Sequence, residues 1–469
     1  MIKRAYSTIP KLTVGLLVLY LLGCAASPGL RREGTGATPV SSVYQAAAVQ
    51  LISAALADSF AYNRLAELTD SFGPRFSGTK NLEDAIDWIL EEMRQDGFEN
   101  VRGEEVMIPR WVRGNEWARL ESPWKKELAM LGLGGSVATP AEGITAEVLV
   151  VGSFEELEKR ADEAEGKIVL FNVPFTNYGE TVRYRYAGAS AAAKAGGVAS
   201  LIRSVGPFSM NTPHTGGMSY EEDVPKIPHA AITVEDAAML GRTAKRGERI
   251  VVTLYMEAHF EDDVPSRNVV AELVGREKPE EIVVLGGHID SWDVGQGAMD
   301  DGGGCVAAWQ AVKLMQDLGL RPRRTVRVVL WTNEENGLRG GNGYRDAHRE
   351  ELDNHILAME SDAGVFKPEG FGFSGSPEAL SIIRKIAQLL QPIGAGEIKE
   401  KGGGADIGPI MKEGVPGMGL NVDGSNYFWY HHTNADTMDK LDPHEMNLCV
   451  AAMAVMAYVV ADMPKELPR

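Results

Sequence analysis

Five side chains that bind metal ions well lie in the second half of the chain: His288, Asp300, Glu335, Asp362 and His432. Three of them come just after apolar runs, at residues 282–285, 326–331 and 356–359. In an open α/β sheet, residues just past the carboxyl ends of parallel strands converge on one crevice. Two imidazoles and three carboxylates in that crevice suit two zinc ions, with one carboxylate bridging them and a water between them.

Glu334 stands next to Glu335 and has no metal to bind in this scheme. A water between two zinc ions is acidified enough to attack near neutral pH, and one zinc polarises the carbonyl under attack. A free carboxylate beside that water can take its proton and return it to the leaving amine. No serine or cysteine nucleophile is needed, so the pattern predicts a dizinc peptidase.

The segments around these residues resemble the co-catalytic zinc aminopeptidase family, and within it the carboxypeptidase Q branch. The likeness is strongest in residues 286–304, 359–364 and 427–432, and it extends from residue 60 to the C-terminus. A single His-x-Asp or Glu-Glu pair is a weak signal, whereas all of these residues in this order and at these spacings are a specific one.

The resemblance implies a role for each metal ligand. His288 and Asp362 would hold one zinc ion. Glu335 and His432 would hold the other, and Asp300 would bridge the two. The cofactor implied is therefore Zn²⁺, two ions per chain.

The resemblance also implies roles for neighbouring residues. Asp290 would orient the imidazole of His288 and fix its tautomer, and Glu334 would be the general base and acid. Other members of the family carry a tyrosine, which stabilises the oxyanion, just before the last histidine ligand. Here His431 holds that place, so the oxyanion donor is left open, and His431 is also the alternative to His432 as a ligand.

The activity implied is that of a metallo-exopeptidase that hydrolyses short peptides, above all dipeptides with free termini. An aminopeptidase acting on longer peptides is the near alternative. A catalytically inactive binding or receptor module on the same fold is an alternative of another class, but such proteins lose ligands and here all five and Glu334 are present. A cyclotransferase on this fold needs no inserted domain, so a β-rich insertion ahead of the ligands argues against it.

The fold class expected is α/β, a doubly wound and mostly parallel sheet with an inserted β-rich domain. Strands alternate with predicted helices at 306–318, 335–350, 377–390 and 443–461, which is typical of such a sheet. Earlier helices are expected over 43–68 and 82–96, the second capped by Asn81. The catalytic domain would comprise residues 44–124 and 261–469, and residues 125–260 resemble a protease-associated domain.

The N-terminus predicts export and a lipid anchor. Three cations precede an apolar run that ends in Leu21-Leu22-Gly23-Cys24, a pattern typical of a secretory signal over residues 1–23. Its end resembles the lipobox of bacterial lipoproteins, so Cys24 would be lipidated and residues 24–43 would form a tether. The protein would then be held in the cell envelope, at the outer membrane in a Gram-negative cell. An uncleaved membrane anchor and an ordinary signal are the alternatives.

The net charge, the cysteines and one loop give three further expectations. The net charge is −18, which argues against a nucleic-acid partner, and a homodimer is left open. Cys305 and Cys449 lie in apolar segments and are expected to be buried thiols. The loop of residues 401–406 would either line the substrate cleft, with Asp406 binding a substrate amine, or be an ordinary surface loop.

Overall fold

The computed structural model describes residues 40–469. The predicted signal peptide (residues 1–23), the lipidation site Cys24 and the tether as far as residue 39 lie outside the described residues. Helix α1 (Val40–Ala57) already begins at Val40, so residues 40–43 belong to a helix and not to a tether. Tyr44 in this helix is buried and its ring packs edge-on against that of Tyr458, which ties α1 to the core.

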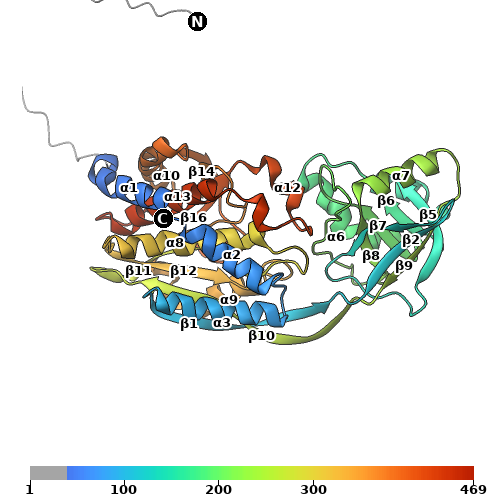
Figure 1. Cartoon of the computed structure of the whole chain (residues 1–469), viewed down its shortest axis with the longest axis horizontal. Coiled ribbons are helices and arrows are strands. Elements are labelled where there is room, and N and C mark those ends of the chain that lie inside the picture. The colour runs from blue at the N-terminus through green and yellow to red at the C-terminus, as the bar shows by residue number, and fades with distance from the viewer. Residues whose placement is uncertain (1–39) are drawn as a thin grey trace, which may run out of the picture. The chain divides into compact units, whose positions relative to one another are not determined.

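The first of two sheets has eight strands, and the four in its centre are parallel (Figure 1). In sheet order the strands are β1 (Glu99–Val112), β10 (His259–Leu273), β12 (Arg324–Trp331), β11 (Lys278–His288), β13 (His355–Glu360), β16 (Gly417–Val422), β14 (Pro368–Ser374) and β15 (Glu397–Glu400). Strands β1, β10 and β14 form antiparallel pairs. The sheet is therefore mixed, and the prediction of a mostly parallel sheet describes only its centre. Residues 361–367, between β13 and β14, are too few for the crossover that a parallel connection requires.

Helices cover both faces of this sheet. One face packs against α1, α2 (Phe60–Phe72), α3 (Lys80–Gln95), α8 (Gly303–Asp317), α10 (Pro377–Ala387) and α13 (Pro443–Asp462). The other packs against α9 (Arg339–Ala347) and α11 (Gly408–Met411). Alternate residues of β12 divide between the two cores, with Val328 in the first and Val329 in the second. Burial on both faces is why the central strands form unbroken apolar runs in the sequence.

Two helix predictions need correction. The helix expected over residues 43–68 is two helices, α1 and α2, separated at Asp58 and Ser59. Asp58 Oδ1 accepts the backbone N–H of Phe60 at 3.0 Å, and an Asp bonded to the nearby main chain competes with continuation of a helix. The cap of α3 is Thr79, whose hydroxyl accepts the N–H of Leu82, and not Asn81.

The second sheet also has eight strands, mixed in direction. In sheet order they are β3 (Lys126–Leu128), β2 (Glu116–Ser122), β9 (Val251–Met256), β5 (Ile144–Val151), β6 (Ile168–Phe171), β7 (Ala199–Arg203), β8 (His229–Ile232) and β4 (Met130–Gly132). Its helices are α4 (Phe154–Lys159), α5 (Ala161–Ala164), α6 (Tyr178–Lys194) and α7 (Val234–Lys245). The strands begin at residue 116, ahead of the predicted boundary at 125. The chain enters this sheet from the end of β1 and leaves it at the start of β10. These two ends lie side by side, because Val112 pairs with His259.

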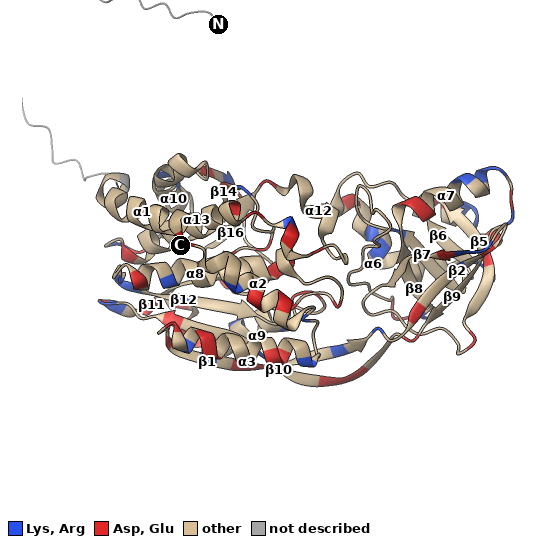
Figure 2. Cartoon of the chain, in the orientation of Figure 1, with Lys and Arg blue, Asp and Glu red and all other residues tan. Residues whose placement is uncertain are grey.

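Within residues 40–469, α13 is the one helix long and apolar enough to cross a membrane. Its most apolar stretch is 89% buried and lies in the main core, as expected of the central helix of a globular domain. Cys305 and Cys449 are free and buried. Lysines and arginines are interspersed with acidic residues along the elements of both sheets in Figure 2.

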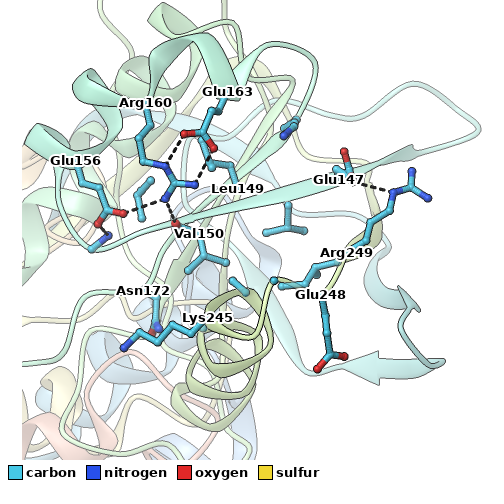
Figure 3. Close-up of a pocket in the computed structure, with 18 residues that line it drawn as sticks. Glu147, Leu149, Val150, Glu156, Arg160, Glu163, Asn172, Lys245, Glu248 and Arg249 are labelled. Carbon is cyan, nitrogen blue, oxygen red and sulfur yellow. Dashed lines mark hydrogen bonds and ion pairs between the residues drawn. The ribbon is translucent and has the colours of Figure 1, made fainter.

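A cavity of about 710 Å³ opens in the second sheet between β5 and α7 and contains none of the predicted site residues. Figure 3 shows two sets of ion pairs in its lining: Arg160 lies between Glu156 and Glu163, and Arg249 reaches Glu147, whereas Lys245 and Glu248 pair with none of the residues drawn. The side chains predicted to carry the chemistry lie elsewhere, at an edge of the first sheet.

Candidate active site

The five predicted ligands meet at one edge of the first sheet. His288 ends β11, Glu335 comes just after β12, and Asp362 comes just after β13. Because these three strands are parallel, their carboxyl ends lie at the same edge. Asp300 comes from the turn before α8, and His432 comes just after the short helix α12 (Tyr427–Tyr430).

Asp300 lies between two pairs, each made of a histidine and a carboxylate. Its Oδ1 is 3.3 Å from His288 Nε2, which is also 3.3 Å from Asp362 Oδ1. Its Oδ2 is 3.3 Å from His432 Nε2, which is 3.0 Å from Glu335 Oε2. Each oxygen of Asp300 thus faces one pair, as a carboxylate that bridges two cations must.

The atoms that face one another here need a cation. His288 Nδ1 lies 2.9 Å from the backbone oxygen of Asp290 and donates to it, so in the neutral ring a lone pair at Nε2 faces carboxylate oxygens. His288 Nε2, Asp300 Oδ2 and Glu335 Oε1 are buried and make no hydrogen bond to any described residue. Unpartnered buried polar atoms are costly, and lone pairs that face one another repel. The residues present therefore fit bound metal, and a nitrogen and carboxylate donor set suits zinc.

The electrostatics of the site show how strongly its carboxylates crowd one another. Burial, and then the neighbouring carboxylate of Asp362, raise the pKa of Glu334 well above its usual range. Burial raises the pKa of Glu335 to about 7; His432 lowers this pKa, and the Asp300 carboxylate raises it further. Cations bound beside these groups would lower both pKa values and keep the carboxylates ionised.

Asp290 does more than the sequence indicates. Its backbone oxygen, and not its carboxylate, orients the His288 ring, because the nearer carboxylate oxygen is 3.8 Å from Nδ1. The fully buried carboxylate accepts the backbone N–H of Glu334 at 3.0 Å and that of Glu335 at 3.3 Å. The Asp290 side chain therefore fixes the turn that presents both glutamates, and the predicted orienting role belongs to its main chain.

Two further aspartates hold the loop that carries Asp300. Asp436 accepts the N–H groups of Ala298, Met299 and Asp300 at 2.7–3.2 Å. Asp301 accepts the N–H of His288 and that of Gly304, each at 3.1 Å. Through these bonds the bridging carboxylate is fixed relative to the end of β11.

The second sheet contributes residues that the sequence analysis missed. His214 Nε2 lies 3.2 Å from His431 Nδ1, and Arg185 of α6 places Nη1 3.4 Å from His432 Nδ1. Burial lowers the pKa of His214 and of His431 well below the usual value, so both rings are neutral. Nothing in the spacing of the sequence connects residues 185 and 214 with the ligands, which are far from them along the chain.

Two other groups near the site carry unusual pKa values. Burial and the carboxylates of Asp300 and Asp362 raise the pKa of Tyr427 well above its usual range, and its ring lies 4.9 Å from that of His431. Asp406 is 1% exposed with both oxygens unpartnered, although the preceding residues 401–405 are exposed or half-buried. Burial and Glu360 raise the pKa of Asp406 well above the usual value, which disfavours the charged form that a substrate amine would need.

Comparison with known proteins agrees with this geometry. The sequence profile of Peptidase family M28 matches residues 268–457. Carboxypeptidase Q of Xenopus laevis is 53% identical over 435 residues, covering 92% of each chain. The crystal structure of a peptidase M28 precursor from Shewanella amazonensis is 37% identical, with a TM-score of 0.88 over 92% of this chain and 99% of that one. A zinc aminopeptidase from Bacillus subtilis shares the fold at 20% identity, with a TM-score of 0.66 over 87% and 96% of the two chains.

The sheet, the convergent nitrogen and carboxylate donors and these relatives define a metal-dependent exopeptidase. Within that class, the identity over nearly the full length of both chains decides the family. The chain belongs to the carboxypeptidase Q group of Peptidase family M28.

Proposed function

We propose that the enzyme binds two zinc ions and hydrolyses short peptides, above all dipeptides with free termini. The observation that carries the proposal is Asp300, whose two oxygens each face one histidine–carboxylate pair. His288 and Asp362 would hold one ion, and Glu335 and His432 the other. Zinc in these positions supplies an acidified water and polarises the carbonyl of the scissile bond.

The side chains carry the remaining steps. Glu334 takes a proton from water as the water oxygen attacks the carbonyl carbon, and the electron pair of the C=O bond moves onto its oxygen. When that pair returns, the C–N bond breaks and Glu334 gives its proton to the leaving nitrogen. The products are an acid and an amine, with one water consumed. The hydrogen bonds from the Glu334 and Glu335 N–H groups to Asp290 keep the base at a fixed distance from the metal ligands.

Arg185 supports a substrate with a free carboxylate. Its side chain is buried, and no carboxylate of the described residues lies within ion-pair distance of it. Its nearest groups are the backbone oxygens of Thr215 and Gly217 and the His432 ring. A buried guanidinium without an acidic partner is costly, and a substrate carboxylate would complete it with paired hydrogen bonds. The carboxyl end of a substrate bound in this way would lie beside His432, close to the bond that is cut, as in a dipeptide.

Gly216 leaves the space between the Arg185 guanidinium and the His432 ring unfilled. Gly216 has φ +132°, and a Cβ built on it would lie 2.2 Å from Arg185 Nη1 and 2.8 Å from His432 Nδ1. Only glycine lets the chain pass between the guanidinium and the histidine ligand.

Amidation of the substrate tests this assignment. Wild-type enzyme should release amino acids from a small panel of free dipeptides, and should cleave the matching dipeptide amides with kcat/KM about 10- to 100-fold lower, the effect of losing one charged hydrogen-bonded pair. Arg185→Met should lower kcat/KM for the free dipeptides by the same factor and leave the amides unchanged. Arg183→Met, two residues away on α6 and stacked on the Phe154 ring, is the control and should still prefer the free acid.

Each alternative gives another result. Equal rates on free and amidated dipeptides would reject carboxylate recognition while leaving the peptidase in place. Preference for longer peptides with a free amino end would indicate an aminopeptidase. A protein that binds metal but cleaves nothing in the panel would be the inactive module on the same fold.

We also propose that residues 1–23 are a signal peptide and that Cys24 carries a lipid, with the enzyme held in the cell envelope. Full-length protein made in a bacterial host should incorporate a labelled fatty acid and sediment with membranes, and Cys24→Ser should lose both properties. Moving the thiol three residues, in the Cys24→Ser, Ser27→Cys variant, should not restore labelling, because the lipobox ends at residue 24. Unlabelled wild-type protein would contradict the anchor without touching the peptidase assignment.

Residues 125–260 are further proposed to be a protease-associated domain that covers the active site. Their contributions to the site, Arg185 and His214, support that role.

A further inference from the structure

Three histidines gather at the active site, and the five ligands account for only one of them. His214, His431 and His432 place ring nitrogens within 4.8 Å of one another. The rings of His431 and His432 are stacked with centroids 3.6 Å apart. His431 Nε2 is 3.5 Å from Asp300 Oδ2, against 3.3 Å for His432, and His431 has no contact with Glu335 to match the 3.0 Å of His432. His431 is therefore beside the centre without being a ligand.

The partner of His431 comes from the other sheet. His214 Nε2 and His431 Nδ1 lie 3.2 Å apart, one ring donating and the other accepting. No hydrogen bond joins His431 Nε2 to any described residue, and its 3.5 Å separation from Asp300 is beyond a normal hydrogen bond. An N–H at His431 Nε2 could therefore donate a hydrogen bond to a substrate group that lies beside Asp300.

The tautomer is decided by His214. Each neutral ring carries one N–H. His214 Nδ1 is buried and has no partner among residues 40–469. If His214 carried its hydrogen there, a buried N–H would be left without an acceptor, whereas a hydrogen on Nε2 is used in the bond to His431. His214 therefore donates, His431 Nδ1 accepts, and the hydrogen of His431 sits on Nε2, directed at the metal centre.

We propose that His431 is a further catalytic residue, whose Nε2–H donates to the oxyanion that forms when water attacks the substrate carbonyl, and that His214 is a positioning residue that fixes this tautomer. The inference rests on the proposed hydrolysis. The negative charge that develops on the carbonyl oxygen would lie on the Glu335–His432 side of Asp300, because Oδ2 is the oxygen nearest His431. A donor held ready for that charge costs no reorganisation during the reaction.

A metal ion bound by the three histidines is the main competing use of the cluster. The Arg185 guanidinium lies 3.4 Å from His432 Nδ1, and a positive charge so close in a buried site disfavours an additional cation. The hydrogen bond between His214 and His431 also occupies one nitrogen of each ring, and His432 Nε2 already faces Glu335.

Substitutions separate the two roles. His431→Ala should lower kcat by about 10²–10³-fold, the usual loss for one oxyanion donor, with KM and zinc content unchanged. His431→Gln keeps an N–H near the same place and should recover part of kcat. His214→Leu removes the donor to Nδ1 and should lower kcat by about 10–100-fold, whereas His214→Gln, which retains an N–H, should stay near wild type. In the His431→Gln background, His214→Leu should have no further effect, because an amide has no tautomer to fix.

A spectroscopic readout makes the test independent of activity. Nitrogen-15 NMR of histidine-labelled, zinc-loaded enzyme should show His431 protonated at Nε2 and His214 protonated at Nε2, and His214→Leu should mix the tautomers of His431. A proton on His431 Nδ1 in the wild type would overturn the proposal. Unchanged kcat in His431→Ala would overturn it too. The control variant Tyr427→Phe removes the nearby hydroxyl, and a large loss of kcat in that variant but not in His431→Ala would make Tyr427 the donor instead. An additional bound ion that disappears in His214→Leu would show that the cluster binds a metal. Inactive wild-type enzyme would instead count against the proposed function, since the tautomers can still be measured.

Discussion

Glu334→Gln is expected to lower kcat by about 10²–10⁴-fold while zinc content stays at the wild-type level. The substitution keeps the shape of the side chain and removes only its ability to take a proton. The turn should survive, because Asp290 binds the main-chain N–H of residues 334 and 335 and not their side chains. KM should change little, since the group acts on water. Steady-state kinetics together with metal analysis of the same preparation provide the measurement.

The adjacent residue is the matched control. Glu335 Oε2 is 3.0 Å from His432 Nε2 and its Oε1 is buried without a partner, so Glu335→Ala should lower both zinc content and activity. If Glu334→Gln lost metal while Glu335→Ala kept it, the two roles would be exchanged. Near-normal turnover in Glu334→Gln would exclude it as the general base.

Purified enzyme is expected to carry about two zinc ions per chain, and removal of the bridging carboxylate in Asp300→Ala should abolish activity. Asp300 contacts both histidine–carboxylate pairs, so its loss should lower the affinity for both ions at once. Asp362→Ala should lower chiefly the affinity for the ion beside His288. Removing a ligand also removes the cation that offsets the crowded carboxylates. Metal analysis after dialysis, followed by zinc titration with activity, measures both effects.

An exposed carboxylate provides the control for metal content. Asp317 is half exposed at the end of α8, where it pairs with Lys313, and Asp317→Asn should keep two ions and full activity. Fully active wild-type enzyme with a single ion would falsify the dinuclear proposal. Activity that survives chelation would remove metal from the mechanism altogether.

The convergence of the proposed metal ligands could be predicted because their positions are set locally, at strand ends. The apolar runs before residues 288, 335 and 362 become β11, β12 and β13, and parallel strands bring the residues at their carboxyl ends to one edge. The roles of Asp300 and His432 were implied by the resemblance, and the two side chains lie beside His288 and Glu335 respectively.

The features that the sequence did not reveal depend on tertiary contacts. His214 and Arg185 reach the site only because residues 116–256 fold into a sheet of their own, and neither lies at a spacing that marks it. The role of the Asp290 main chain was missed for a related reason, since backbone acceptors leave no trace in residue types. The outer strands of the first sheet were mispredicted in direction because periodicity reports burial and not orientation.

The division of the site between two sheets has a consequence for how the enzyme can change. Every predicted zinc ligand and the base lie at strand ends or loops around the first sheet, while the guanidinium proposed to select the substrate lies on α6, beside the second sheet. Apart from His214, substitutions in residues 116–256 can therefore alter which peptides are accepted while the hydrolytic chemistry is left as it is. Relatives that keep the metal centre and vary this segment should differ in substrate range more than in mechanism.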